Sequence, residues 1–196
     1  MRRFVNPGNT AFEVAVNSQI YVDKTGLLAY TNSVINTKQA LICSSRPRRF
    51  GKSITADMLC AYYSRGCDSD SIFASYEIAK SDSYKKYLNQ YDVIYLDIQW
   101  CMMDAGSAEQ TVSYLNYHVI EELKEIYPQI LLDGIRTAYG AMSCINAQTG
   151  VKFIVIIDEW DVLIRDEAAN EAVLQDYINF LRGMFKGSEP TKFIAL

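Results

Sequence analysis

The sequence predicts an α/β domain in which helices cover both faces of a parallel sheet. Apolar, β-branched runs alternate along the chain with segments whose apolar residues recur at helical spacing. One run, Phe153 to Ile157, is apolar without interruption, as in a strand buried on both faces of a parallel sheet. At 196 residues, the chain is long enough for about one well-buried domain of this class.

Strands and helices are expected in alternating order. We predict strands over residues 39–44, 91–100 and 153–157. We predict helices over residues 54–65, 108–127 and 172–185, with one or two more within residues 129–146. Gly66 is the expected C-cap of the first helix, and Ser107 with Gln110 forms a capping-box pattern before the second.

The end of the chain, residues 192–196, has the composition of one more buried strand at its beginning. A natural domain rarely ends inside its core. We therefore expect the chain to be a fragment of a longer protein, truncated before its last strand.

Composition excludes several classes of protein. The net charge of −4 supplies no global field that would attract nucleic acid or an anionic membrane. Five cysteines are scattered without CxxC spacing, which argues against a disulfide framework and against a zinc site. Neither a signal peptide nor a membrane-spanning run is recognisable. We expect a cytoplasmic protein with reduced thiols and no membrane partner.

A short basic loop follows the first expected strand and leads directly into a helix. It contains Gly51-Lys52-Ser53, which places glycine, lysine and serine as a phosphate-binding loop requires. We expect the unpaired amides at the helix start to bind phosphate oxygens, Lys52 to reach the β- and γ-phosphates, and Ser53 to ligate Mg²⁺. The residues expected on the nucleotide are Arg48, Arg49, Phe50, Gly51, Lys52, Ser53 and Ile54.

This loop departs from the full pattern at its first position, where Arg46 stands in place of glycine. Pro47 also lacks an N–H group, although it lies early in the loop. Three interpretations of the basic residues remain open: a solvated charged loop, a nucleic-acid contact, or a triphosphate site. The strand before the loop and the helix after it favour the triphosphate site.

An acidic pair, Asp158 and Glu159, follows the apolar run that ends at Ile157. This is the form of a Walker B segment, with carboxylates at the carboxyl end of a buried parallel strand, where open α/β sheets bind ligands. We expect Asp158 to hold Mg²⁺ and Glu159 to orient the attacking water. Alternatively, the pair simply ends a strand.

Other polar residues are not assigned to the candidate site. Asp161 and Arg165 are expected at the surface of the following turn, and Asp97 is either a buried hydrogen-bonded acid or a residue at the edge of the site. The one histidine, His118, lies within an expected helix without partners at suggestive spacing, so a structural role is expected. A single histidine also argues against triad hydrolysis.

Three segments together resemble the predicted AAA-ATPase-like family of bacterial proteins. They are Tyr21-Val-Asp-Lys-Thr25, Arg46-Pro-Arg-Arg-Phe-Gly-Lys-Ser53 and Ile157-Asp-Glu-Trp-Asp161. The second also resembles the loop of archaeal signalling ATPases of the STAND type, which reads G-P-R-R-x-G-K-T. Family members commonly have Tyr where this chain has Trp160, an exchange of one aromatic residue for another.

The resemblance implies an additional-strand (ASCE) P-loop NTPase with strand order 5-1-4-3-2 and a catalytic Glu159 beside the Walker B Asp158. Residues 193–196 would then be the central fourth strand. We expect residues 39–196 to form the NTPase core, incomplete at its C-terminus, and residues 1–38 to pack on it. Family members usually continue into a helical lid and often a nuclease-like domain of PD-(D/E)xK type. No nuclease activity is assigned to this chain.

The segment Tyr21 to Thr25 carries the family signature without an evident chemistry. Asp23 is expected to cap a helix that contains Leu27 and Leu28, with Lys24 and Thr25 in its first turn. A place near the nucleotide base is the alternative.

These observations lead to three functional hypotheses. The first is an ATP·Mg²⁺-binding domain that hydrolyses ATP slowly and acts as a switch for a partner or an appended nuclease-like domain. Its arginine finger would be Arg48, Arg49 or a residue from a second copy in a homo-oligomer. The second is an interaction module with a degenerate loop that binds nucleic acid or protein. The third is a small-molecule kinase, which usually lacks the acid after the Walker B aspartate.

Overall fold

A computed structural model describes residues 2–44, 50–166 and 170–196. Contacts between residues divide the chain into two compact units. The first unit comprises Met1–Tyr95, Phe153–Ile156 and Ala195–Leu196. The second comprises Leu96–Lys152 and Ile157–Ile194.

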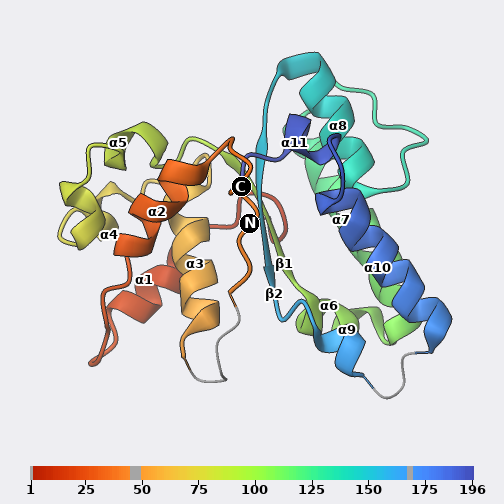
Figure 1. The fold of residues 1–196 in the computed structure, drawn as a ribbon, viewed down its shortest axis with the longest axis horizontal. Helices are drawn as coiled ribbons and strands as arrows, with labels where there is room; N and C mark the ends of the chain where they lie inside the picture. The colour runs from red at the N-terminus through yellow and green to blue at the C-terminus, as the bar shows by residue number, and fades with distance from the viewer. Residues whose placement is uncertain (1, 45–49, 167–169) are drawn as a thin grey trace. The chain divides into compact units, whose positions relative to one another are not determined.

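The sheet is small, open and parallel. Its two strands, β1 (Asp92–Asp97) and β2 (Phe153–Asp158), are hydrogen-bonded neighbours (Figure 1). Short segments from both ends of the chain flank them. Val5 forms an antiparallel bridge with Ile94. The N–H of Ala195 donates to the carbonyl of Phe153 over 2.7 Å. The predicted mixed α/β architecture is therefore confirmed, with fewer strands than expected.

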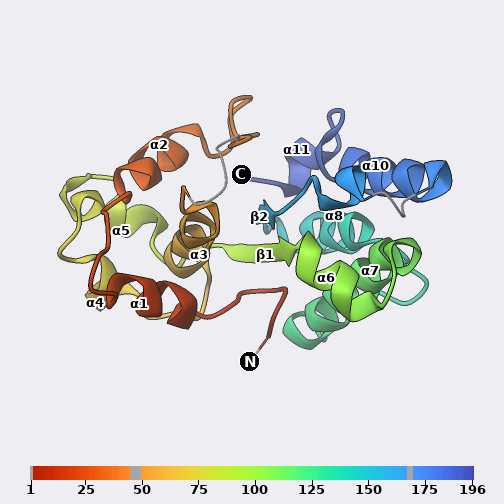
Figure 2. The same ribbon diagram turned by 90° about the horizontal axis from the view of Figure 1, so that it is seen from below.

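Helices of the first unit surround an aromatic core. Helix α1 lies beside α3 in both ribbon views, and the two helices are in contact (Figures 1 and 2). Phe12 on α1 stacks on Phe73 with ring centroids 5.1 Å apart. The helices of this unit are α1 (Thr10–Val16), α2 (Gly26–Val34), α3 (Lys52–Tyr63), α4 (Asp70–Phe73), the 3₁₀ helix η1 (Glu77–Lys80) and α5 (Tyr84–Tyr87).

Tyrosine hydroxyls in this core are satisfied by polar residues of α2. Tyr63 is fully buried, and its hydroxyl donates to Oδ1 of Asn32 over 2.8 Å. The same hydroxyl lies 2.7 Å from Oγ1 of Thr31. Asn32 in turn donates through Nδ2 to the hydroxyl of Tyr62 over 3.0 Å. Because buried polar groups need partners, this network sets the position of α2 on α3.

Replacing Tyr63 by Phe should therefore lower the free energy of unfolding by about 1–3 kcal/mol, because buried Asn32 loses a hydrogen-bond donor. Urea denaturation measures this change. The matched control is Tyr117→Phe, at an exposed position of α7 (Ala108–Ile126), where a change within about 0.5 kcal/mol is expected. Equal losses in the two variants would contradict a role for the network.

Helices of the second unit pack around α7, which occupies nearly the range predicted for it. Leu115, Val119 and Leu123 are buried on α7, which contacts both α8 and α10. Buried residues of α10 include Val173, Tyr177 and Met184. Besides α7, the unit contains α6 (Ile98–Ala105), α8 (Ala138–Thr149), α9 (Val162–Arg165), α10 (Glu171–Phe185) and α11 (Pro190–Phe193).

The strand predicted over residues 39–44 is absent from the structure. These residues form no strand, and Leu41 and Ile42 are 57% and 44% exposed. A strand needs neighbouring backbone groups with which to pair. On that side of β2 the neighbour is the segment at Ala195–Leu196, whose groups bond to β2 and to the N–H of Asn36.

Several predicted boundaries were also wrong. Strand β1 ends at Asp97, before the predicted residue 100, because the Asp97 side chain accepts the N–H of Trp100 over 2.9 Å and caps α6. Helix α3 ends at Tyr63 with Ser64 as its C-cap, ahead of Gly66. Ser107 is the N-cap of α7 but makes no side-chain capping bond. Residues 129–137 form no helix, and α11 includes the first residues of the strand predicted over 192–196.

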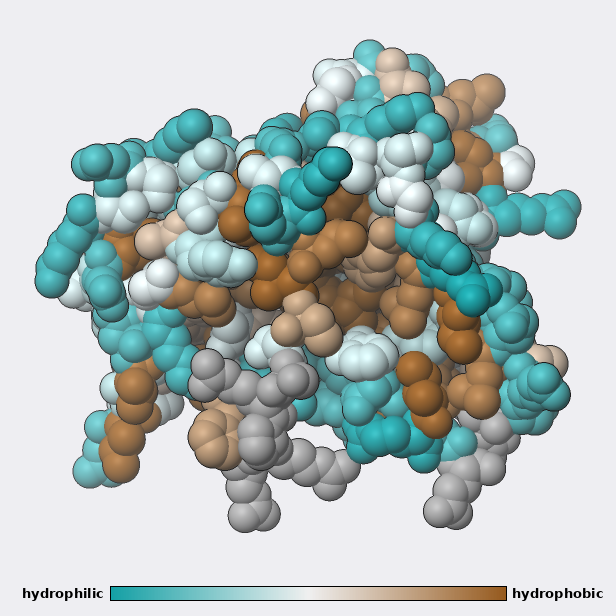
Figure 3. All heavy atoms as spheres, in the orientation of Figure 1, coloured by the Kyte–Doolittle hydropathy of each residue, from teal (hydrophilic) through white to brown (hydrophobic). Residues whose placement is uncertain are grey.

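The loop between α1 and α2 exposes apolar side chains to solvent (Figure 3). Ile20 is 85% exposed, and Val22 is also exposed. Within the described ranges, no helix combines the length and the hydropathy needed to traverse a lipid bilayer.

Candidate functional site

Helix α3 begins at Lys52, immediately after a left-handed turn at Gly51. The φ angle of Gly51 is 71°, a conformation that glycine adopts at little cost. No side-chain hydrogen bond caps this helix, and its first turn contains no acidic residue. Ser53 and Ile54 are exposed. The predicted phosphate loop thus meets the start of a helix that is open to solvent.

The first turn of α3 leaves three amides without a partner among the described residues. The carbonyl of Gly51 accepts the N–H of Thr55 over 3.0 Å and its Oγ1 over 2.9 Å, which fixes the first turn. The N–H groups of Lys52, Ser53 and Ile54 make no hydrogen bond to any other described residue. Together with the helix dipole, such amides favour an anion such as phosphate.

The basic part of the loop lies outside the described residues. This applies to Arg46 and Pro47 and to the predicted nucleotide contacts Arg48 and Arg49. Of the remaining predicted contacts, the side chain of Phe50 is exposed and Lys52 is half-buried.

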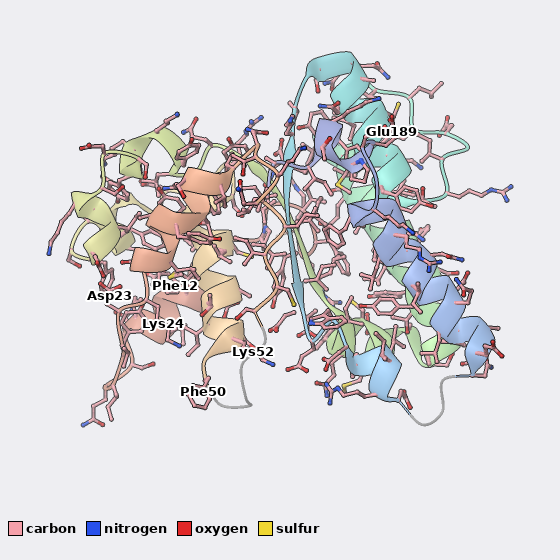
Figure 4. The ribbon with its side chains drawn as sticks, in the orientation of Figure 1. Phe12, Asp23, Lys24, Phe50, Lys52 and Glu189 are labelled. Carbon is pink, nitrogen blue, oxygen red and sulfur yellow. The ribbon has the colours of Figure 1, made fainter. Side chains whose placement is uncertain are left out.

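The family-signature segment contacts the loop, which sequence reasoning missed. Nζ of Lys24 donates to the carbonyl oxygen of Phe50 over 2.7 Å. Figure 4 shows Phe50 and Lys52 at one end of α3 and Lys24 on the segment beside it. The only signal in the sequence was the presence of both segments in the family resemblance. Their separation of 26 residues gives no pattern of its own.

Asp23 acts differently from the predicted helix cap. Helix α2 begins at Gly26, so Lys24 and Thr25 precede it. Asp23 accepts the N–H of Thr25 through Oδ1 over 2.8 Å, and the N–H of Glu77 through Oδ2 over 3.0 Å. Its carboxylate therefore connects the start of α2 to the start of η1.

These bonds determine the ionisation of Asp23. Desolvation raises the pKa of its carboxyl, but the N–H groups of Glu77 and Thr25 outweigh that effect and hold the pKa below its ordinary value. Because the folded-state pKa is lowered, the stabilisation is present at neutral pH and is lost as the pH falls through that pKa.

Gly51→Ala should destabilise the protein for two reasons. A side chain at positive φ costs about 1 kcal/mol, and the added Cβ would lie 2.7 Å from Nζ of Lys24. Displacing that ammonium breaks its bond to Phe50, at a further cost of about 1 kcal/mol. Thermal or urea unfolding measures the sum.

Gly66→Ala is the matched control for this substitution. Gly66 has a φ of 86°, and nothing lies within 4 Å of a Cβ placed there, so this variant reports the backbone cost alone. If the two variants lost equal stability, the contact with Lys24 would contribute nothing.

Asp158 lies at the carboxyl end of β2, in the second unit. It is buried, and its Oδ1 accepts the N–H of Glu159 over 3.0 Å. Its Oδ2 has no partner among the described residues. A buried carboxylate with one free oxygen can accept a hydrogen bond or ligate a cation.

Glu159 has a left-handed backbone conformation and an ion-pair partner. Its φ is 50°, which is uncommon outside glycine and asparagine and directs the chain away from β2. Nη2 of Arg165 lies 3.4 Å from Oε2 of Glu159, and Nε of Arg165 lies 2.8 Å from Oδ2 of Asp161. Asp161 and Arg165 are partly exposed, as predicted, but Arg165 also pairs with the carboxylate of Glu159, which the sequence did not indicate.

Trp160 is held through its backbone. The hydroxyl of Tyr177 on α10 donates to the carbonyl of Trp160 over 2.6 Å. Burial, with a smaller contribution from Asp161, raises the pKa of Tyr177, so this donor stays protonated at any physiological pH. Helix α10 thereby fixes the turn that follows Asp158 and Glu159.

Two other residues noted in the sequence have local roles. Asp97 caps α6 as described above. His118 lies on α7 with its ring centroid 4.2 Å from that of Tyr114 and 5.1 Å from that of Tyr117. These aromatic contacts agree with a structural role for the histidine.

Within the part of the chain that the structure describes, no group of three or more His, Cys, Asp and Glu side chains could hold a metal ion. A nucleotide-bound Mg²⁺ needs few protein ligands, because phosphate oxygens and waters fill most of its six positions. The hydroxyl of Ser53 and the free oxygen of Asp158 are oxygen donors of the kind that Mg²⁺ prefers. Each of these two residues, taken by itself, suits this ion when a nucleotide accompanies it.

Comparison with known proteins identifies the family. A family model described as a predicted AAA-ATPase matches residues 8–194, so the chain belongs to this AAA-ATPase-like family. The description of the family suggests a nucleotide as ligand. No curated protein and no solved structure matches the chain.

Proposed function

We propose that this protein binds ATP with Mg²⁺ and hydrolyses the ATP slowly. The observation that carries this proposal is the open start of α3, where the amides of Lys52, Ser53 and Ile54 have no partner among the described residues. Membership of the AAA-ATPase-like family supports it independently. An acidic protein needs such a local site, because its net charge repels a triphosphate.

The residues of the first unit bind the triphosphate. The amides after Gly51 donate to the β-phosphate, and the ammonium of Lys52 neutralises charge on the β- and γ-phosphates. The hydroxyl of Ser53 and the carboxylate of Asp158 hold Mg²⁺, which, when bound, neutralises charge that develops on the phosphate oxygens. Phe50 and Ile54 border the loop on either side.

Glu159 orients the attacking water in this proposal. Its carboxylate oxygens accept hydrogen bonds, and the left-handed conformation of Glu159 turns the backbone away from β2. Nη2 of Arg165 lies 3.4 Å from Oε2 of Glu159. An exposed ion pair at this distance is weak, so a water molecule can replace the guanidinium beside the carboxylate. Arg48, Arg49 or an arginine from a second copy supplies the remaining positive charge.

The arrangement of strands in the sheet is part of the same proposal. We propose an additional-strand (ASCE) arrangement in which residues 194–196 begin a strand beside β2 and residues 1–38 pack on the core. The bonds from β2 to Ala195 and Leu196, and from Asn36 to Ala195, support this arrangement. So does the pairing of β1 with β2. The nucleotide-bound state is proposed to act as a switch for a partner, a second copy or an appended nuclease-like domain.

Lys52→Ala should weaken ATP binding by about tenfold to a hundredfold, because a charge-assisted contact to the phosphates is lost. Calorimetric titration with ATP in the presence of Mg²⁺ measures the affinity. An exposed lysine of the second unit, Lys192, provides the matched control Lys192→Ala, which should leave the affinity unchanged. If the native protein binds no nucleotide, the proposal fails and the interaction-module hypothesis is favoured.

The same titration with Asp158→Asn, and with the double variant, tests whether both acidic and basic residues serve one nucleotide. Two groups on the same Mg²⁺·ATP give non-additive losses, whereas independent groups give additive ones. Additive losses would separate Asp158 from the triphosphate site. Transfer of the γ-phosphate to a small molecule, with little release to water, would favour the kinase hypothesis.

Glu159→Gln should keep ATP binding and lower hydrolysis at least about 100-fold, because the amide cannot accept a proton from the attacking water. Phosphate release measures the rate, and calorimetry confirms binding. Glu189→Gln is the matched control, since Glu189 is an exposed glutamate of the same unit that also pairs with a cation, Lys192. Unchanged turnover in Glu159→Gln would remove Glu159 from the catalytic role.

A further inference from the structure

Lys24 occupies the space beside Gly51 that a side chain at that position would fill. Its ammonium lies 2.7 Å from the point where a Cβ of residue 51 would stand, and it donates to the carbonyl of Phe50 over 2.7 Å. Two observations thus place one cation against the peptide that joins Phe50 to Gly51. That peptide immediately precedes Lys52.

The contact with the carbonyl determines where the next amide points. The described residues contain no cis peptide bond, so the carbonyl of Phe50 and the N–H of Gly51 point in opposite directions from one rigid plane. Because Lys24 holds the carbonyl on its own side, the N–H of Gly51 is directed away from Lys24. Glycine resists rotation of this plane only weakly, so an external contact is needed to keep it in place.

Lys24 is itself held in place by its neighbours. Asp23 and Thr25, on either side of it, accept the N–H groups of Glu77 and Ile78 over 3.0 and 3.2 Å. Tyr21 packs edge-on against Phe12 and Tyr76, and partial burial raises its pKa to about 12, so its ring stays neutral. The backbone that presents Lys24 is therefore anchored before any ligand binds.

From this geometry we infer that Lys24 is a positioning residue, which sets the Phe50–Gly51 peptide so that the N–H of Gly51 donates to the phosphates. The inference rests on the proposed function and adds the role of the Tyr21–Thr25 segment to it. Lys24 acts through the peptide and makes no contact with the γ-phosphate. Loop amides of this kind surround the α- and β-phosphates, so ADP and ATP depend on Lys24 equally.

Lys24→Met is the substitution that tests this role, because methionine keeps a flexible stem and lacks the donor. It should weaken the binding of both ADP and ATP by about tenfold, the effect of one charge-assisted hydrogen bond at an exposed site. Lys24→Arg, which restores a cationic donor, should recover most of the affinity. Lys38→Met, at another exposed lysine of the first unit, should leave both affinities unchanged.

A measurement without nucleotide separates this inference from the proposed function. In a ¹H–¹⁵N spectrum of the nucleotide-free protein, Lys24→Met should shift the Gly51 amide, and Lys24→Arg should shift it less. The melting temperature of the nucleotide-free Lys24→Met variant should stay within about 4 °C of the native value. These readouts test the peptide orientation even if the native protein binds no nucleotide.

The outcomes have distinct meanings. Equal loss of ADP and ATP affinity, with rescue by arginine, supports the inference. Loss of ATP affinity alone would overturn it in favour of a direct contact with the γ-phosphate. An unmoved Gly51 amide, or unchanged affinities beside a damaging Lys52→Ala, would overturn it and leave the proposed function standing.

Discussion

The left-handed turn at Gly51 is the constraint on which the candidate site depends. It starts α3 without a side-chain cap, so the first amides of the helix remain unpaired among the described residues. A capping serine or an acidic first turn would satisfy or neutralise those groups. The absence of a Cβ at this turn also admits the ammonium of Lys24. Gly51 thus creates both the uncapped start of the helix and the space that Lys24 occupies.

Local charge arrangement, rather than net charge, distinguishes the start of α3 from the end of β2. The protein is acidic overall, yet the start of α3 brings together the helix dipole, Lys52 and the nearby Lys24. The end of β2 carries the opposite charge. There the carboxylates of Glu159 and Asp161 both pair with the single guanidinium of Arg165. Asp158 is left with one free oxygen within the described structure. Each part has the charge that its proposed partner, phosphate or cation, requires.

In the family-signature segment, Tyr21 to Thr25, the contacts of each side chain explain which residue type stands there. Asp23 accepts two amides, Lys24 donates to the loop, and Thr25 accepts the N–H of Ile78. Gly26 follows, and a Cβ there would lie 3.0 Å from Oε2 of Glu77. Each residue from Asp23 to Gly26 therefore makes a different contact that requires its residue type. Capping of α2 accounts for only one of these contacts.

The sequence alone determined the elements whose signals are local. Helices α7 and α10 and strand β2 were predicted closely, because long amphipathic periodicity and an uninterrupted apolar run need no knowledge of neighbours. Only the tertiary structure decided the rest, since the strand predicted over residues 39–44 required a pairing partner and the end of β1 depended on a side-chain cap. The contacts of Lys24 with Phe50 and of Arg165 with Glu159 join residues that no periodicity relates. Such contacts arise when the packed chain brings donors and acceptors together, and this is where the site acquires its geometry.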